Sequence, residues 1–193
     1  MSENTQKRET IKLTLIGNQS VGKTDIRNAF LKVDSSEENV SKNGYQKQET
    51  TFKLDDGKEI KLIIWDTAGQ ERFHSIALNS VKNSQGIILV FDVSNRMSFN
   101  DLFTWMNGIK DATDKVSIIL FGNKIDNEKR EVTKEEAEKF AKDYNIPYIE
   151  VNAKLNENID KGFSIVINDA YKKYGTTTAL ALQRRRRREK NKC

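Results

Sequence analysis

Two glycines followed by a lysine and a threonine place the strongest constraint on how this chain can fold. Gly17 is separated by four residues from Gly22, and Gly22 is followed directly by Lys23 and Thr24, which gives the spacing G-x-x-x-x-G-K-[ST]. Before this motif, residues 11 to 15 alternate between apolar and polar side chains. The alternation predicts a strand, so the glycines are expected to form the turn from a strand into a helix. Because glycine lets backbone N–H groups approach an anion closely, this turn is typical of a phosphate-binding loop. An incidental glycine-containing turn is the alternative.

The side chains of this motif also predict a metal ion beside the phosphates. Lys23 is expected to reach the β- and γ-phosphates, and the Thr24 hydroxyl to bind the magnesium ion that accompanies them. A second alternating run, residues 60 to 65, predicts another strand, and Asp66 follows its last residue. A carboxylate at this place would hold magnesium through water.

The next residues suggest a reaction and a base. Gly69 could bring a backbone N–H to the γ-phosphate, and Gln70 could orient an attacking water. A third apolar run, residues 116 to 121, leads into the sequence Gly-Asn-Lys-Ile-Asp, which ends at Asp126. A carboxylate there can accept hydrogen bonds from N1 and the 2-amino group of guanine, which adenine cannot supply. The predicted base is therefore guanine.

Four motifs now stand in order along the chain: GNQSVGKT, WDTAGQERF, GNKID and NAK. Together they resemble a Ras-superfamily small GTPase, most closely the Rab branch, from about Thr10 to Tyr171. The resemblance implies GTP or GDP and Mg²⁺ as ligands, slow GTP hydrolysis that depends on an activator, and effector, exchange-factor and GTPase-activating proteins as partners. In the last motif it implies that the Ala153 N–H meets the guanine oxygen and that Lys154 covers the ring. The residues expected to bind nucleotide are Gly17, Gln19, Ser20, Val21, Gly22, Lys23, Thr24, Asp25, Gly69, Asn123, Lys124, Asp126, Ala153 and Lys154.

The expected fold is α/β: the P-loop NTPase fold of small G proteins, with a mostly parallel central sheet and helices on both faces. The continuous apolar run at residues 87 to 91 predicts a central strand, and Thr133 with Glu136 predicts a capping box that opens a helix reaching Tyr144. A last strand is expected at residues 148 to 151, and a last helix at about 157 to 174. We expect a flexible N-terminus (1–9), one GTP-binding domain (10–174) and a flexible polybasic tail (175–193).

Several positions depart from the family pattern. The family places a magnesium-binding threonine in its first switch loop, where matching the surroundings puts Lys42; an ammonium has no lone pair for a metal, and Ser41 is one residue away. Both remain candidates. Ser35 falls where the family has an aromatic side chain beside guanine, which predicts fast nucleotide exchange. Asp25 would lie close to the α-phosphate, although an acid that starts a helix and faces solvent is the favoured interpretation.

Charge is concentrated at the end of the sequence. The chain carries 33 Lys and Arg against 28 Asp and Glu, a net charge of +5, and residues 184 to 193 alone carry +6. The only cysteine, Cys193, is the last residue of this basic segment. The resemblance to Rab proteins implies a prenyl group on this cysteine, and one prenyl group plus a polybasic patch is a combination that anchors stably. We therefore expect a cytoplasmic protein held peripherally on the cytosolic face of a membrane. A solvated terminus, a nuclear-import signal and a nucleic-acid arm use the same electrostatics, and no nucleic-acid partner is expected.

Three functions remain to be separated. The first is a Rab-like GTPase that acts as a molecular switch in membrane or vesicle traffic. The second is a membrane-tethered module that holds nucleotide but cycles poorly, which the departures at Ser35 and Lys42 suggest. The third is an adaptor whose essential contacts are made by its basic tail.

Overall fold

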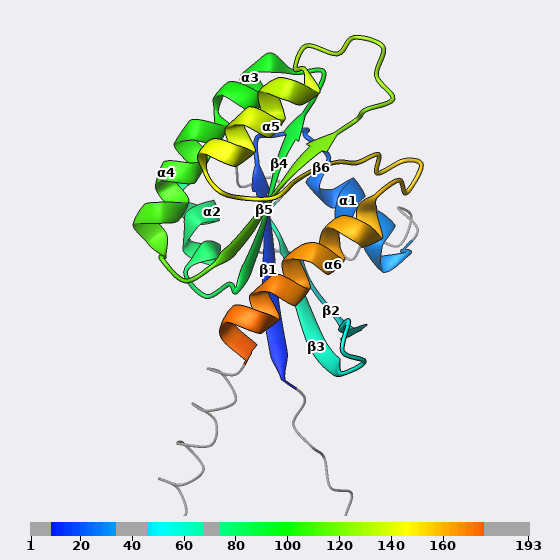
Figure 1. Cartoon of the computed structure of the whole chain (residues 1–193), viewed down its shortest axis with the longest axis vertical. Helices are drawn as coiled ribbons and strands as arrows, with labels where there is room; N and C mark the ends of the chain where they lie inside the picture. The colour runs from blue at the N-terminus through cyan, green and yellow to red at the C-terminus, as the bar shows by residue number, and fades with distance from the viewer. Residues whose placement is uncertain (1–8, 34–45, 68–73, 176–193) are drawn as a thin grey trace, which may run out of the picture.

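The computed structural model describes residues 9–33, 46–67 and 74–175 (Figure 1). Its centre is a six-stranded sheet with the order β2-β3-β1-β4-β5-β6, in which only the pair of β2 and β3 is antiparallel. The mostly parallel sheet predicted from the sequence is therefore confirmed. The strands are β1 (Thr10–Gly17), β2 (Gln46–Lys53), β3 (Glu59–Asp66), β4 (Gly86–Asp92), β5 (Ser117–Asn123) and β6 (Tyr148–Glu150).

Helices cover both faces of this sheet, as predicted. Figure 1 shows α1 and α6 on one side of the strands and the remaining helices on the other. The described helices are α1 (Lys23–Leu31), α2 (His74–Val81), α3 (Arg96–Asn100), α4 (Leu102–Ala112), α5 (Lys134–Asp143) and α6 (Ile159–Ala170), and α6 continues into a π-helical turn, Tyr171–Gly175. No helix among these described residues combines the length and apolarity that crossing a bilayer requires.

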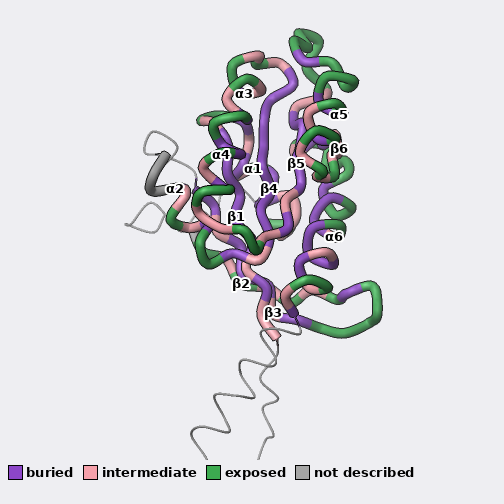
Figure 2. Tube along the Cα trace, turned by 60° about the vertical axis from the view of Figure 1, so that its left-hand side comes forward, coloured by how far each residue is buried: buried purple, intermediate pink, exposed green. Residues whose placement is uncertain are grey.

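The hydrophobic core lies in two layers, because successive side chains of a strand point to opposite faces. Along β4, Ile88 and Val90 pack toward α1 and α6, whereas Ile87, Leu89 and Phe91 pack toward α2, α4 and α5. Every residue of β4 is buried, and Figure 2 shows burial concentrated on the strands and on the inner faces of the helices. Each such side chain contributes about 1.5–3 kcal/mol relative to exposure. The carboxyl ends of the parallel strands are thereby fixed at one edge of the sheet.

Helix ends show where local sequence was decisive. Thr133 caps α5 in the predicted capping box: its hydroxyl accepts from the Glu136 N–H at 3.2 Å, and the Glu136 carboxylate accepts from the Thr133 N–H at 2.9 Å. A hydrogen bond from Arg96, followed by the bond from Thr133, lowers the pKa of Glu136 to about 2. The last helix begins two residues later than predicted, because Glu157 pairs with Asn152 across the preceding loop and Asn158 has a φ of +59°.

At the end of β1 the backbone comes unusually close to β4. Gly17 has a φ of +143°, and a Cβ atom built there would lie 2.1 Å from the carbonyl oxygen of Val90. Both the dihedral and the contact exclude any larger residue, so the first glycine of the motif is required by the packing of two central strands.

We predict that Gly17→Ala lowers the free energy of unfolding by about 3 kcal/mol, because it combines backbone strain with a clash against a main-chain atom that cannot move aside. Gly57→Ala is the matched control: Gly57 also has a positive φ, +84°, but a Cβ atom built there would approach only Lys53 Cε, at 4.0 Å. The control should lose only about 1 kcal/mol. Urea unfolding followed by circular dichroism measures both, and equal losses would contradict the assignment of the clash.

Candidate nucleotide-binding site

The loop between β1 and α1 closes around the side chain of Lys23. Gly22 precedes the first residue of α1 with a left-handed φ of +94°. The Lys23 ammonium is buried and donates to the carbonyl oxygens of Gly17 at 3.0 Å and Asn18 at 2.6 Å. The lysine therefore folds back over its own loop, which holds a positive charge where the sequence predicted a phosphate.

Thr24 and Asp66 meet beside this loop. The Thr24 hydroxyl donates to Asp66 Oδ2 at 2.7 Å, and Asp66 is fully buried at the end of β3. A hydroxyl and a carboxylate oxygen are hard ligands, and magnesium is commonly held by one or two such groups together with the phosphates of its substrate. These two residues therefore fit the predicted ion. Arg27 Nη1 also donates to Asp66 Oδ2, at 3.0 Å, a contact that no motif in the sequence predicts.

A cavity of about 470 Å³ lies next to the phosphate loop. The structure brings six of the predicted nucleotide-binding residues together in its lining: Asp25, Asn123, Lys124, Asp126, Ala153 and Lys154. Asp25 is exposed and at the same time lines this cavity, so it faces the solvent, as favoured from the sequence, on the side where a ligand would lie. The predicted residues Gln19 and Ser20 are also exposed, at the tip of the phosphate loop.

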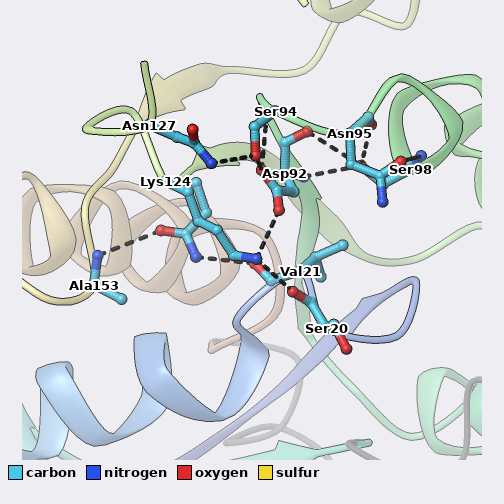
Figure 3. Close-up of polar contacts among 10 residues, drawn as sticks. Ser20, Val21, Asp92, Ser94, Asn95, Ser98, Lys124, Asn127 and Ala153 are labelled. Atoms are coloured by element: carbon cyan, nitrogen blue, oxygen red, sulfur yellow. Dashed lines mark hydrogen bonds and ion pairs between the residues drawn. The ribbon is translucent and has the colours of Figure 1, made fainter. Parts of the chain in front are cut away.

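Side chains at the end of β5 hold the phosphate loop to the cavity (Figure 3). Asn123 Nδ2 donates to the Val21 carbonyl at 2.9 Å, and Asn123 Oδ1 accepts from the Ala153 N–H at 3.3 Å. Lys124, which has a φ of +65°, donates through Nζ to the Ser20 carbonyl at 2.7 Å. Asn123 and Lys124, which belong to one predicted base-binding segment, thus connect the phosphate loop with the other one, at Ala153.

Asp92 is a site residue that the sequence analysis did not identify. Its Oδ2 forms an ion pair with Lys124 Nζ at 2.7 Å, and its Oδ1 accepts from the N–H and hydroxyl of Ser94 at 2.8 and 2.6 Å. Asp92 ends β4 and lies beside Asn123 in the parallel register. Asp92 could have been identified from the order of the strands, because an acidic residue at the end of the strand beside β5 must lie next to Asn123 and Lys124.

Asn18 ties the phosphate loop to the helices on the other face of the sheet. Its Nδ2 donates to Asp101 Oδ2 at 2.6 Å, and its Oδ1 accepts from the Trp105 indole N–H at 2.8 Å. Trp105 is 2% exposed and belongs to the core between the sheet and α4. Trp105 therefore combines core packing with a hydrogen bond to the phosphate loop.

The loop after β6 presents a buried donor in the cavity wall. Asn152 accepts through Oδ1 from the N–H groups of Lys154 at 3.0 Å and Leu155 at 3.2 Å. Its Nδ2 is buried and has no hydrogen-bond partner within the part of the chain that the structure describes. A polar donor of this kind fits a cavity that receives a polar ligand.

Some predicted residues lie outside the described residues. These are the candidates for water positioning and the γ-phosphate contact, the two candidates in the first switch, and the lipidation candidate: Gln70, Gly69, Ser41, Lys42 and Cys193.

The sequence of this chain matches that of a known protein family. The model of the Ras family matches residues 12–172. Among curated proteins, the Ras-related protein Rab-8A of Bos taurus is 41% identical over 160 residues, which cover 82% of this chain and 77% of the relative. Ras-related protein Rab-8B of Homo sapiens is similar to the same extent, at 41% identity over 160 residues and the same two coverages.

The ion pair of Asp92 with Lys124 generates a prediction. Asp92→Asn keeps the shape of the side chain but removes the charge that orients Lys124. We expect guanine-nucleotide release to become about tenfold faster, equivalent to about 1.4 kcal/mol, because the ion pair is replaced by a weaker hydrogen bond from the ammonium to a neutral amide oxygen. Asp169→Asn, which breaks the exposed 2.7 Å pair with Lys173 on α6, is the matched control and should change nothing. Release of a fluorescent GDP is the measurement, and similar rates in both variants would show that Asp92 has no part in the site.

Proposed function

This chain belongs to the Ras family of small GTPases, and we propose that it is a Rab-like switch in vesicle traffic that binds GTP and hydrolyses it to GDP and phosphate. The observation that carries the proposal is the connection that Asn123 and Lys124 make between the phosphate loop and the cavity. A ligand that must occupy both places at once contains phosphates and a base.

Guanine is the base that the cavity residues favour. In our proposal Asp126 accepts hydrogen bonds from N1 and the 2-amino group, the Ala153 N–H donates to the guanine oxygen, and Lys154 covers the ring. An acceptor that lies opposite two donors of the bound base discriminates against a base without them, because that base would leave the acceptor unpaired. Adenine nucleotides are excluded for this reason.

At the other end of the site, Lys23 and the backbone N–H groups of the loop bind the β- and γ-phosphates. Thr24 and Asp66 are the residues that would hold magnesium, which when bound neutralises charge that develops on the phosphates. Gln70 orients the water that attacks the γ-phosphorus in line with the bond to the β-phosphate oxygen, and the Gly69 N–H binds a γ-phosphate oxygen. Hydrolysis is slow until an activating protein supplies a further positive charge.

The switch and its partners follow from this assignment. GTP orders the segments around Ser41, Lys42 and Gln70, and hydrolysis releases them, so effector, exchange-factor and GTPase-activating proteins distinguish the two states. We further propose that the basic residues 184 to 188 and a prenylated Cys193 hold the protein peripherally on the cytosolic face of a membrane.

The first test concerns the base. Asp126→Asn should shift the preference of the protein from guanine to xanthine nucleotides, because an amide supplies the donor that the second xanthine oxygen needs. Competition between GTP, XTP and ATP for a fluorescent nucleotide measures this preference. Equal affinity of the unmodified protein for ATP and GTP would contradict the proposed function.

A second prediction concerns hydrolysis. Gln70→Leu should leave the affinity for guanine nucleotide nearly unchanged and lower activator-stimulated hydrolysis by about tenfold or more, because it removes a contact made only in the transition state. Single-turnover hydrolysis of bound GTP is the measurement. If the unmodified protein also shows no hydrolysis with any activator, the poorly cycling alternative is favoured instead.

The tail provides the third prediction. Cys193→Ser should release the protein from membranes, whereas replacing Arg184 to Arg188 by glutamine should cause a partial loss that increases with salt. Fractionation of cells at two ionic strengths measures both variants. A Cys193→Ser protein that still sediments with membranes would exclude the lipid anchor and favour the adaptor.

A further inference from the structure

A buried arginine lies directly behind the residues that would hold magnesium. Arg27 follows Thr24 by one turn of α1, so their side chains share one face of the helix. The Arg27 side chain is 3% exposed and that of its partner Asp66 is not exposed at all. Burying two charges is unfavourable unless they are paired and hydrogen-bonded, so Arg27 and Asp66 each require the other at this place.

The guanidinium is fixed in its orientation. Nη1 donates to Asp66 Oδ2 at 3.0 Å, while Nε and Nη2 both donate to Asn28 Oδ1, at 3.1 and 2.7 Å. Asn28 is itself 9% exposed. Because the guanidinium is planar, contacts on two of its edges prevent it from turning away from the carboxylate. The Asp66 oxygen that accepts from Arg27 is also the one that accepts from Thr24, at 2.7 Å.

We infer that Arg27 is a positioning residue that places a permanent positive charge at the magnesium side of the site, so that nucleotide retention depends less on magnesium than it would without that charge. This inference rests on the proposed function. It concerns how Arg27 acts through Asp66 and Thr24, and it requires no direct contact between Arg27 and the nucleotide.

Two electrostatic consequences support it. The guanidinium neutralises the Asp66 carboxylate and repels a divalent cation nearby, which weakens the binding of magnesium. When the ion leaves, the same guanidinium remains, so Asp66 does not become an uncompensated negative charge beside the phosphates. The affinity for nucleotide therefore differs less between the magnesium-bound and the magnesium-free protein than it would if Asp66 had no cationic partner.

A purely structural role makes a different prediction. If Arg27 only fastened α1 to β3, its removal would loosen the phosphate loop and accelerate nucleotide release by the same factor with and without magnesium. The electrostatic role changes the ratio of the two release rates. That ratio is the quantity to measure.

The experiment uses the full chain loaded with fluorescent GDP and compares release in excess Mg²⁺ with release in excess chelator. Chelation should accelerate release from the unmodified protein less than about tenfold, and this factor should rise at least about tenfold in Arg27→Gln, because the compensating charge is lost. Arg27→Lys, which keeps the charge, should stay within about threefold of the unmodified ratio. Arg96→Gln, which breaks a 2.7 Å ion pair with Glu136 on the surface, is the matched control and should leave the ratio unchanged.

A second readout does not depend on nucleotide release. Titration of the GDP-bound protein with Mn²⁺, followed by electron paramagnetic resonance, should show about tenfold tighter metal binding in Arg27→Gln than in the unmodified protein. Circular dichroism of each variant shows whether it has folded.

The outcomes are separable. An equal acceleration of release in both conditions, or unchanged Mn²⁺ affinity in a folded Arg27→Gln protein, overturns the inference and leaves Arg27 a structural residue. If Arg27→Gln does not fold, the unmodified protein still tests the inference. A chelator that accelerates GDP release from the unmodified protein by about a hundredfold or more would overturn it. Failure of the unmodified protein to bind GDP at all would instead refute the proposed function.

Discussion

Hydrogen bonds from side chains to the backbone of the phosphate loop are the interactions on which the rest of the site depends. Asn123 and Lys124 donate to the carbonyls of Val21 and Ser20, so these two carbonyls point toward β5. The corresponding N–H groups are then available to the opposite side of the loop, where an anion can bind. Because both donors sit at the end of a buried parallel strand, the fold itself fixes their position.

The same logic explains the ion pair behind them. Lys124 could approach the loop carbonyl from several directions, but Asp92 at the end of the adjacent strand restricts it to one. The parallel register of β4 and β5 is therefore part of the site. A side chain that never touches the ligand can control its affinity by orienting the residues that do.

Local patterns were sufficient for much of the fold. The alternation in β1, the continuous apolar run of β4 and the Thr133 capping box are short-range signals, and the structure confirms each of them. The start of α6 was missed because it depends on a bridge between Asn152 and Glu157 that closes the preceding loop. The helical periodicity of the residues after Glu157 gives no indication of that bridge.

The residues of the candidate site could be predicted where a single motif supplies them. Contacts between segments that are distant in the sequence could not be predicted. Lys23, Thr24 and Asp66 follow from spacing after a strand, whereas the partner of Arg27 lies 39 residues away and that of Asn18 lies 83 residues away in Asp101. An arginine in an amphipathic helix is expected to face the solvent. Only the assembled sheet, which brings the end of β3 against α1, makes its burial favourable.

The contact between Asn18 and Trp105 gives the protein an optical property. The indole N–H bonds directly to a residue of the phosphate loop, so the excited-state environment of Trp105 changes whenever that loop rearranges. The intrinsic fluorescence of Trp105 therefore reports on the arrangement of the phosphate-binding loop without an added dye.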